Sequence, residues 1–223
     1  NVCQVSRGCP YRCVFCSVTE FFGNTFRIRD VDGVIKEIEQ MPGRFLIFLD
    51  DNIFGDPEFA SRLMTKMIPL KKKWVSQCTL RLADNPKLLK LAAQSGCIGM
   101  LVGLESVNKD SLKASGKPIK FDSYADRIHR IIDHGIHIDG SFVFGFDNED
   151  VSIFEKTLDF ICKLKLSAAT FSILTPFPGT NLLYRFEGEN RIIDRNWQHY
   201  DGTHAVFRPA RMTPEQLEEG RAW

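Results

Sequence analysis

Short apolar stretches alternate with stretches of helical periodicity along most of this 223-residue chain, and this alternation limits its fold more than any other feature. We expect six strands, at residues 2–6, 45–50, 75–82, 98–105, 138–146 and 169–174. Several of these stretches are apolar at consecutive positions, which is typical of parallel strands that are covered on both faces. Repeated strand–helix alternation predicts an α/β fold with a parallel sheet and right-handed crossovers.

The helices that we expect between the strands have recognisable starts. Asp56 and Asn85 each precede a proline, which is the pattern of an N-cap followed by proline at the first helical position. Apolar residues recur at helical spacing within 31–41, 124–132 and 151–161. Six β/α units are too few for a closed eight-stranded barrel. The residues therefore leave open a curved six-stranded partial barrel and a flat doubly wound sheet.

The regular pattern fades after the sixth strand, so we expect a core at 1–180 and a mixed C-terminal extension at 181–223. Because the chain starts at Asn1 and ends near an apparent helix start, we expect part of a longer protein that lacks an N-terminal domain. A net charge of +1 gives no electrostatic reason to expect a nucleic acid or an anionic membrane as partner. No apolar stretch approaches the roughly 20 residues of a membrane span. An odd number of scattered cysteines predicts free thiols and a cytoplasmic protein.

Three of the seven cysteines lie close together in "RGCPYRCVFC", directly after the first predicted strand. A disulfide would leave one of Cys9, Cys13 and Cys16 unpaired, and a redox pair would need only the last two. Structural zinc prefers four ligands, and the chain has no second Cys-x-x-Cys, although Cys3 could supply a fourth thiolate. Thiolates at short, irregular spacing favour an iron–sulfur cluster over zinc. Three thiolates would leave one iron of a [4Fe–4S] cluster open to a substrate.

Polar residues follow several of the other predicted strands. They are Asp50, Asp51, Asn52, Glu105, Ser106 and Thr175. The carboxyl ends of parallel strands meet at one edge of a sheet or barrel, where binding sites form. We therefore expect the cysteines and these polar groups to share one site.

The segment "CPYRCVFC" resembles the C-x3-C-x-aromatic-C signature of the radical S-adenosylmethionine (SAM) superfamily, with Phe15 as the aromatic residue. "FLIFLDDNIF", "VGLES" and "GSFVFGFDNED" resemble motifs of the second, fourth and fifth strands of that family. "ILTPFPGT" and "HYDGTHAVFRPARMTPEQL" resemble segments of its cobalamin-linked branch. Asp50-Asp51-Asn52 departs from the common Gly-Gly-Glu triplet, in a way that also resembles this branch. The resemblance spans residues 1 to about 217.

The resemblance implies a six-stranded parallel (β/α)6 partial TIM barrel in which Cys9, Cys13 and Cys16 ligate a [4Fe–4S] cluster. It implies reductive cleavage of SAM to a 5′-deoxyadenosyl radical, in an enzyme that is a cobalamin-linked methyltransferase or forms related bonds. A small-molecule substrate, an electron donor such as flavodoxin or ferredoxin, and cobalamin in a domain outside this chain are implied as well. A non-catalytic zinc or iron–sulfur module, structural or electron-transferring, is the alternative.

The resemblance also points to residues that bind the cofactors. Acidic side chains suit the sulfonium and ammonium of SAM, whereas its carboxylate needs a cation, for which we select Arg81. Gly140, Gly145 and Glu149 match the motif near the adenine. The full set of expected contacts is Phe15, Asp50, Asp51, Asn52, Arg81, Glu105, Ser106, Gly140, Gly145 and Glu149.

Overall fold

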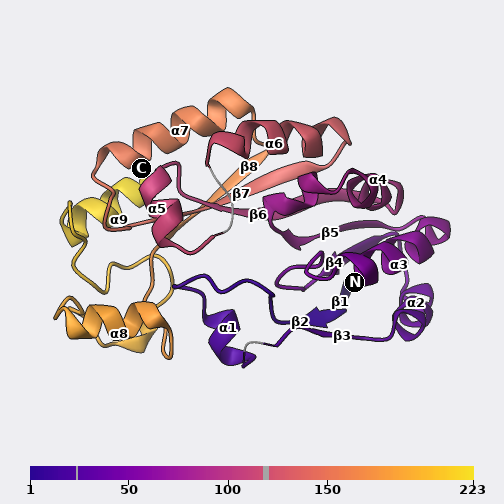
Figure 1. Ribbon diagram of the computed structural model, residues 1–223, viewed down its shortest axis with the longest axis horizontal. Coiled ribbons are helices and arrows are strands. Elements are labelled where there is room, and N and C mark those ends of the chain that lie inside the picture. The colour runs from indigo at the N-terminus through magenta and orange to yellow at the C-terminus, as the bar shows by residue number, and fades with distance from the viewer. Residues whose placement is uncertain (24, 118–120) are drawn as a thin grey trace.

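The computed structural model describes residues 1–23, 25–117 and 121–223, and these form a six-stranded parallel sheet in the order β1-β4-β5-β6-β7-β8 (Figure 1). The strands are β1 (Val2–Cys3), β4 (Phe45–Phe48), β5 (Lys73–Cys78), β6 (Cys97–Glu105), β7 (His137–Phe144) and β8 (Ala168–Ile173). Each strand is added beside the preceding one, which is the winding of a (β/α) barrel and not of a doubly wound sheet. The predicted partial barrel is confirmed.

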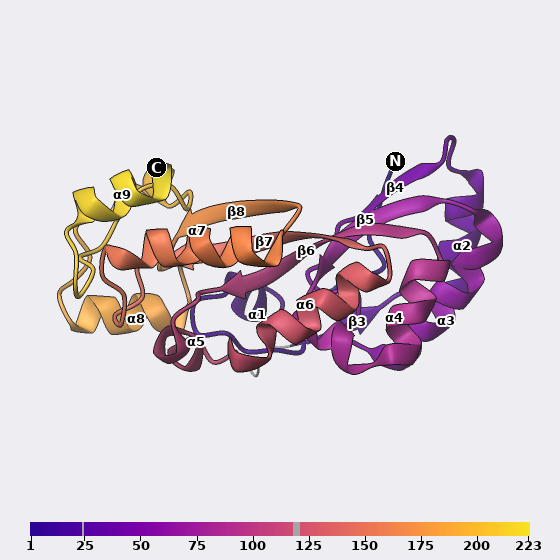
Figure 2. The ribbon, with the colours of Figure 1, turned by 90° about the horizontal axis from the view of Figure 1, so that it is seen from above.

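Helices follow the strands and cover one face of the sheet (Figure 2). They are α2 (Val31–Gln40), α3 (Pro57–Met67), α4 (Pro86–Gln94), α6 (Tyr124–Asp133) and α7 (Ser152–Leu164). The two predicted caps are confirmed, because Asp56 accepts hydrogen bonds from the backbone at 58 and 59 and Asn85 from that at 88. None of the helices in the described part of the chain is long and apolar enough to cross a membrane.

Several short elements were not expected from the sequence. They are the antiparallel ribbon of β2 (Ser6–Arg7) and β3 (Arg27–Ile28), the helices α1 (Ser17–Phe21) and α5 (Lys109–Ala114), and 3₁₀ turns at Ile68–Leu70, Leu80–Asp84, Phe121–Ser123 and Trp197–His199. Elements of two to six residues carry too little periodicity to stand out in a sequence. The predicted first strand therefore divides into β1 and β2, and the end of the predicted third strand is a 3₁₀ turn.

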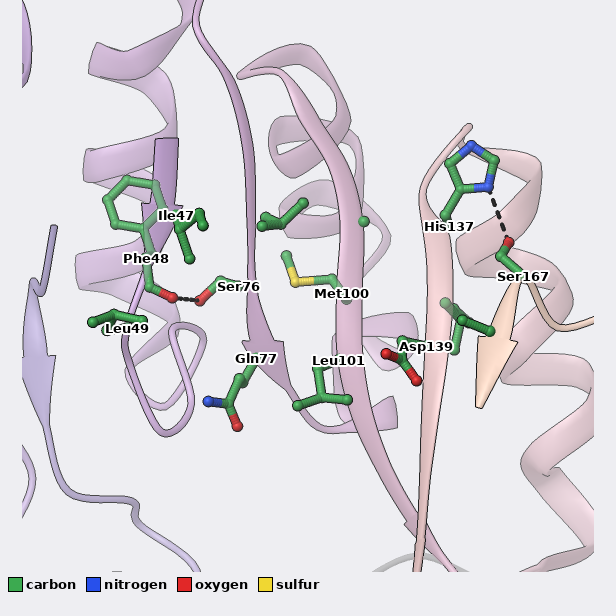
Figure 3. A pocket seen from close by; sticks show the side chains of 14 residues that line it. Ile47, Phe48, Leu49, Ser76, Gln77, Met100, Leu101, His137, Asp139 and Ser167 are labelled. Atoms are coloured by element: carbon green, nitrogen blue, oxygen red, sulfur yellow. Dashed lines mark hydrogen bonds between the residues drawn. The ribbon is translucent and has the colours of Figure 1, made fainter. Parts of the chain in front are cut away.

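Burial alternates along the strands, because the helices cover only the outer face of the sheet. On β4, Leu46 and Phe48 are buried, whereas Phe45 and Ile47 are 45% and 36% exposed. The expectation that both faces are covered is thus wrong for this strand: its inner apolar residues face an open concave side. A cavity of about 410 Å³ lies on that side, lined by residues such as Leu49, Gln77, Leu101 and Asp139 (Figure 3).

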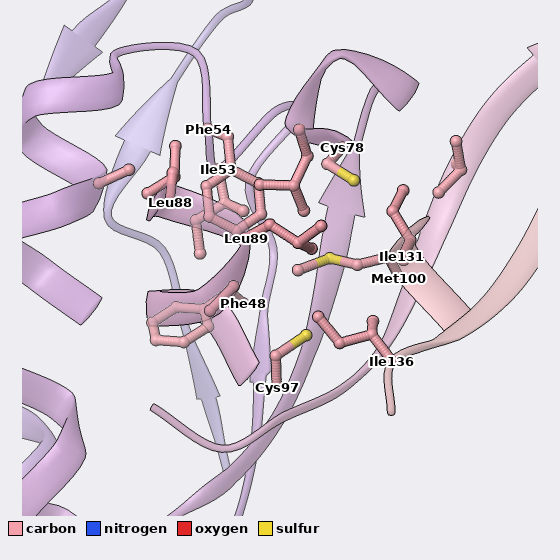
Figure 4. Close-up of a cluster of buried hydrophobic side chains, with 14 of the residues drawn as sticks. Phe48, Ile53, Phe54, Cys78, Leu88, Leu89, Cys97, Met100, Ile131 and Ile136 are labelled. Atoms are coloured by element: carbon pink, nitrogen blue, oxygen red, sulfur yellow. The ribbon is translucent and has the colours of Figure 1, made fainter. Parts of the chain in front are cut away.

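The main hydrophobic core fills the space between the outer face and the helices (Figure 4). Its largest member, Trp74, is fully buried, packs edge-on to Phe48 at 5.4 Å and donates from Nε1 to the Ser95 carbonyl at 3.1 Å. Burial of an apolar side chain of this kind contributes about 1.5–3 kcal/mol to folding. This core holds the strands in register and so fixes the positions of their carboxyl ends.

A second hydrophobic cluster joins the last strands to the C-terminal part of the chain. Phe186 of α8 (Asn181–Gly188) stacks on Phe207 at 4.7 Å, and Leu217 of α9 (Pro214–Ala222) is fully buried. The tail also bonds to β8, whose outer edge pairs with no strand in the described residues: Ile173 N–H donates to the Gly202 carbonyl at 2.7 Å. The C-terminal residues therefore pack against the barrel near its carboxyl edge.

Candidate active site

The three closely spaced cysteines lie on a loop between β2 and α1, which we call the cluster loop (residues 8–16). Its neighbours hold it by main-chain bonds: Val14 N–H donates to the Ser115 carbonyl at 3.1 Å, and the Val14 carbonyl accepts from Leu182 N–H at 3.3 Å. Gly8 begins the loop at φ +89°, and a Cβ there would overlap the carbonyl oxygen of Thr25. The loop is therefore anchored on α5, on α8 and on the β2–β3 ribbon.

Cys9, Cys13 and Cys16 line a single cavity of about 210 Å³ at the carboxyl end of the sheet. All three are partly buried free thiols, and burial raises the pKa of each, that of Cys13 to about 12. Among the described residues, no three His, Cys, Asp or Glu side chains are grouped to hold one metal ion. A cubane cluster takes its thiolates on separate irons, so three thiols around a shared cavity fit such a cluster.

Glu105 and Lys117 form a buried ion pair in the wall of the same cavity. The ammonium of Lys117 also donates to the Gly103 carbonyl. The side chain of Glu105 is only 10% exposed and that of Lys117 only 6%. Glu105 has φ +64° beside an irregular pairing of β6 with β7. A non-glycine residue in this region costs of order 1–3 kcal/mol and occurs preferentially at functional sites.

In the triplet Asp50-Asp51-Asn52 after β4, the two aspartates have different environments. Asp50 is fully buried and turns away from the cavity, accepting from Val5 N–H at 3.2 Å and from Ser6 Oγ at 2.5 Å. Burial raises the pKa of Asp50, although these hydrogen bonds oppose the shift. Asp51 lines the cavity and accepts from Gly8 N–H at 3.1 Å.

Asn52, the third residue of the triplet, lies next to the cluster loop. Its Nδ2 is 4.0 Å from Cys9 Sγ. Its Oδ1 is buried and has no hydrogen-bond partner among the described residues. Buried polar atoms are almost always paired in native proteins, so this acceptor calls for a donor that the described residues do not supply. Asn52 is not one of the described residues that line the cavity of the thiols.

Three of the predicted residues form a buried hydrogen-bonded group, which we call the brace: Ser106, Gly145 and Glu149. None of the three lines the cavity of the thiols. Glu149 accepts from Ser106 Oγ at 2.6 Å, from Gly145 N–H at 3.0 Å and from Phe146 N–H at 3.2 Å. Burial raises the pKa of Glu149 to about 7. The brace ties the end of β6 to the end of β7. Gly140 is also buried, and a Cβ there would lie 2.9 Å from Leu104 Cδ1 in the core.

The two remaining predicted residues flank the cavity in different ways. Phe15 lines it and packs edge-on against Phe146 at 5.9 Å. Arg81 is exposed in the 3₁₀ turn after β5, where its guanidinium lies 5.7 Å from the centre of the Tyr11 ring. Tyr11 itself lines the cavity, so Arg81 reaches the site only through that ring.

Several residues of the cavity wall were not expected from the sequence, and Lys117 is the one cation among those that the structure describes. The others are Val18, Gln77, Cys78, Thr79, Leu101, Gly103 and Ser141. Lys117 follows a short helix and belongs to no motif that we identified. Gln77, Leu101 and Ser141 point to the inner side of their strands, and the alternation of side chains along β5, β6 and β7 could have identified them.

The family model of the Radical SAM superfamily matches residues 3–161. The chain is 34% identical over 221 residues to bacteriochlorophyllide d C-12(1)-methyltransferase of Chlorobaculum tepidum, covering 96% of this chain and 48% of that protein. It is 32% identical over 225 residues to an uncharacterized methyltransferase of Pyrococcus horikoshii, covering 98% and 49%. The chain thus spans about half the length of these curated relatives.

Solved structures share the fold at low sequence identity. The radical S-adenosylmethionine methyltransferase TsrM from Kitasatospora setae, solved with cobalamin and a [4Fe–4S] cluster, superposes with a TM-score of 0.76 at 18% identity, covering 85% of this chain and 37% of that one. The cobalamin-dependent radical enzyme OxsB, solved with aqua-cobalamin and S-adenosylmethionine, gives 0.72 at 15% identity, covering 99% and 40%. The partial barrel is therefore common to these proteins.

Proposed function

This chain belongs to the radical SAM superfamily, and we propose that it is the catalytic core of a cobalamin-dependent methyltransferase or of an enzyme that forms related bonds. Family membership favours a catalytic core over the non-catalytic zinc or iron–sulfur module that the cysteine spacing left open. Several relatives carry methyltransferase in their names, which supports methyl transfer as the activity of the whole protein. We take residues 1–180 as the core and 181–223 as an extension that packs on it.

The observation that carries this proposal is the enclosure of Cys9, Cys13 and Cys16 in one cavity together with polar side chains of both signs. In our proposal these thiolates hold a [4Fe–4S] cluster and leave one iron for SAM. When bound, the cluster supplies the electron that cleaves SAM to methionine and a 5′-deoxyadenosyl radical. Phe15 lines the cavity and packs against Phe146 beyond the end of β7, and in our proposal its ring shields the cluster from water.

We assign the amino-acid end of SAM to the ion pair of Glu105 and Lys117. The zwitterion of an amino acid carries an ammonium and a carboxylate, which are complementary to a Glu–Lys pair. Lys117 thereby takes the role that we expected of Arg81, because its ammonium is inside the cavity. Asp51 and the unpaired Oδ1 of Asn52 add acceptors for the cationic groups of SAM. Ser106, Gly145 and Glu149 act by positioning the ends of β6 and β7.

The substrate is a small molecule, and we propose that it binds on the concave face of the barrel. The 410 Å³ cavity there shares Gln77 and Leu101 with the cavity of the thiols, so the two adjoin. Its wall is apolar at Ile47 and Leu49 and polar at His137 and Asp139. Such a surface suits a substrate with a large apolar body and a polar end.

Anaerobic reconstitution with iron and sulfide tests the proposal. We expect about four irons and four sulfides per chain, and formation of 5′-deoxyadenosine and methionine from SAM after reduction with dithionite. Replacement of Cys13 by alanine should abolish both cluster and cleavage, whereas Cys162→Ala, at an exposed thiol, should leave them unchanged. Binding of zinc without sulfide, or 5′-deoxyadenosine formation by Cys13→Ala, would contradict the proposal.

A further inference from the structure

An exposed surface of arginine and phenylalanine lies beside the cluster loop. We define the arginine patch as Arg7, Arg27, Phe21 and Phe22. Arg7 and Arg27 are register partners on the β2–β3 ribbon, so their side chains leave the same face side by side. The guanidinium of Arg27 lies 5.8 Å from the centre of the Phe22 ring, whose centre is 5.0 Å from that of Phe21. The four side chains therefore form one continuous surface.

The positive charge of this patch is not neutralised within the described residues. No carboxylate there lies within ion-pair distance of Arg7 or Arg27, whereas the neighbouring Arg29 pairs with Glu37 at 2.5 Å. Like charges directly opposite on two strands destabilise the pairing by roughly 0.2–1 kcal/mol. Residues 7–29 contain four arginines and one acidic residue, Glu20, in a chain with a net charge of +1. The ribbon thus offers two adjacent cations to an external anionic group.

The patch also has the composition of a protein interface. Phe21 is 81% exposed, the largest exposed fraction among the large hydrophobic side chains of the described residues. Aromatic residues and arginine are enriched in the parts of interfaces that contribute most to binding. Arg7 donates from Nε to the neutral Gln4 Oε1 at 3.1 Å, so neither guanidinium has a carboxylate partner among the described residues. An aromatic anchor next to these two positive charges fits a partner with an apolar contact area surrounded by carboxylates.

The patch is directly connected to the thiol cavity. Arg7 is two residues before Cys9, and the intervening Gly8 donates to Asp51 of the cavity wall. A Cβ on Gly8 would lie 3.6 Å from Phe22 Cβ, so Phe22 packs directly on the start of the cluster loop. A protein bound at the patch would therefore be separated from the thiols by little more than this loop.

We propose that the arginine patch docks an acidic one-electron carrier protein that reduces the cluster, an inference that rests on the function proposed above. Charge complementarity selects an acidic partner, and the position beside the thiols selects one that delivers electrons. In the transfer, one electron leaves the reduced carrier and enters the cluster, so the carrier is oxidised and the cluster reduced by one electron each. Attraction between opposite charges raises the rate of encounter and makes binding sensitive to salt.

The test uses an acidic flavodoxin as the carrier and the protein with its reconstituted cluster. The first measurement is the affinity for oxidised flavodoxin, followed by flavin fluorescence at low and at moderate salt. We expect the double variant Arg7→Glu/Arg27→Glu to bind at least about 10-fold more weakly and to lose most of the salt dependence. The double variant Arg44→Glu/Arg208→Glu changes two exposed arginines elsewhere by the same charge and should bind within about 3-fold of the unsubstituted protein.

A second measurement compares two reductants. Flavodoxin hydroquinone should reduce the cluster of the patch variant more slowly by a similar factor, whereas dithionite should reduce it at the unsubstituted rate. Phe21→Ala changes no charge at a highly exposed site and should also weaken flavodoxin binding.

Equal flavodoxin affinity of the patch and control variants would overturn the proposal. So would loss of self-association in the patch variant with flavodoxin affinity unchanged, because the patch would then bind a second copy. Absence of SAM cleavage in the dithionite-reduced unsubstituted protein would overturn the proposed function, and the binding titration would still decide the docking site.

Discussion

The carboxylate of Glu105 and the ammonium of Lys117 form a buried ion pair in the wall of the cavity that holds the three cysteine thiols. The pair joins Glu105 at the end of β6 to Lys117 in the segment after α5, 12 positions further along the chain. Two charges withdrawn from water are costly unless each keeps its partner. The pair is therefore a structural link, and in our proposal it is also the site for the zwitterion of SAM.

Replacement of Lys117 by methionine should leave Glu105 buried without its cation. We expect a loss of about 3–5 kcal/mol in the free energy of unfolding, measured by denaturant titration. SAM affinity, measured by equilibrium dialysis on the folded protein, should fall at least about 10-fold, or 1.4 kcal/mol. Lys113→Met, at an exposed position of the preceding helix α5, is the control and should change neither quantity appreciably.

The double variant Glu105→Gln/Lys117→Met separates the two roles of the pair. Removal of both charges should restore a large part of the stability, because no uncompensated charge remains. SAM affinity should stay low, because the binding groups are gone. Retention of normal SAM affinity by Lys117→Met would rule out the assignment of this lysine to the ligand.

Gly103 leaves the space in which the ion pair lies. A Cβ at this position would overlap Glu105 Oε1 and Lys117 Nζ, so Gly103→Ala should force the pair apart. We expect a loss of about 1–3 kcal/mol in stability and SAM affinity reduced several-fold, measured as for Lys117. Gly188→Ala meets open space on α8 and is the matched control. Unchanged stability and SAM binding in Gly103→Ala would show that the pair can move without consequence.

The sequence predicted the order of strands and helices correctly because apolar periodicity and caps such as Asp56 act locally. It also predicted that Cys9, Cys13 and Cys16 meet at the carboxyl ends of the strands. It could not assign the task of each polar side chain, because neighbouring residues on a bending chain point in different directions. Asp50 and Asp51 are adjacent, yet only Asp51 lines the cavity. Lys117 escaped notice because its position depends on tertiary packing around α5 and on no local pattern.

The different environments of Asp50 and Asp51 predict opposite effects of one chemical change. Asp50→Asn weakens the acceptor for Val5, Ser6 N–H and Ser6 Oγ, so we expect a loss of about 1–3 kcal/mol in the free energy of unfolding. Its SAM affinity, measured on the folded protein, should stay normal. Asp51→Asn should lower SAM affinity with less than about 1 kcal/mol lost in stability, because Asp51 is only partly buried. The reverse pattern would show that Asp50 is the residue that contacts the ligand.

Glu149 gives the protein a predicted dependence of stability on pH. Burial raises its pKa from 4.5 to about 7, so the native state binds a proton more tightly than the unfolded chain. A raised pKa contributes stability at low pH that is lost as the pH rises from about 4.5 through about 7. Between pH 5 and pH 8, the free energy of unfolding of the unsubstituted protein should therefore fall by about 2–3 kcal/mol relative to Glu149→Gln, which has no proton to lose there. Denaturant unfolding of both proteins at several pH values measures this difference. Protonation of the other groups affects both proteins alike and therefore cancels in the comparison. A difference that stays constant with pH would mean that the hydrogen bonds from Ser106 Oγ and Gly145 N–H hold Glu149 ionised in spite of its burial.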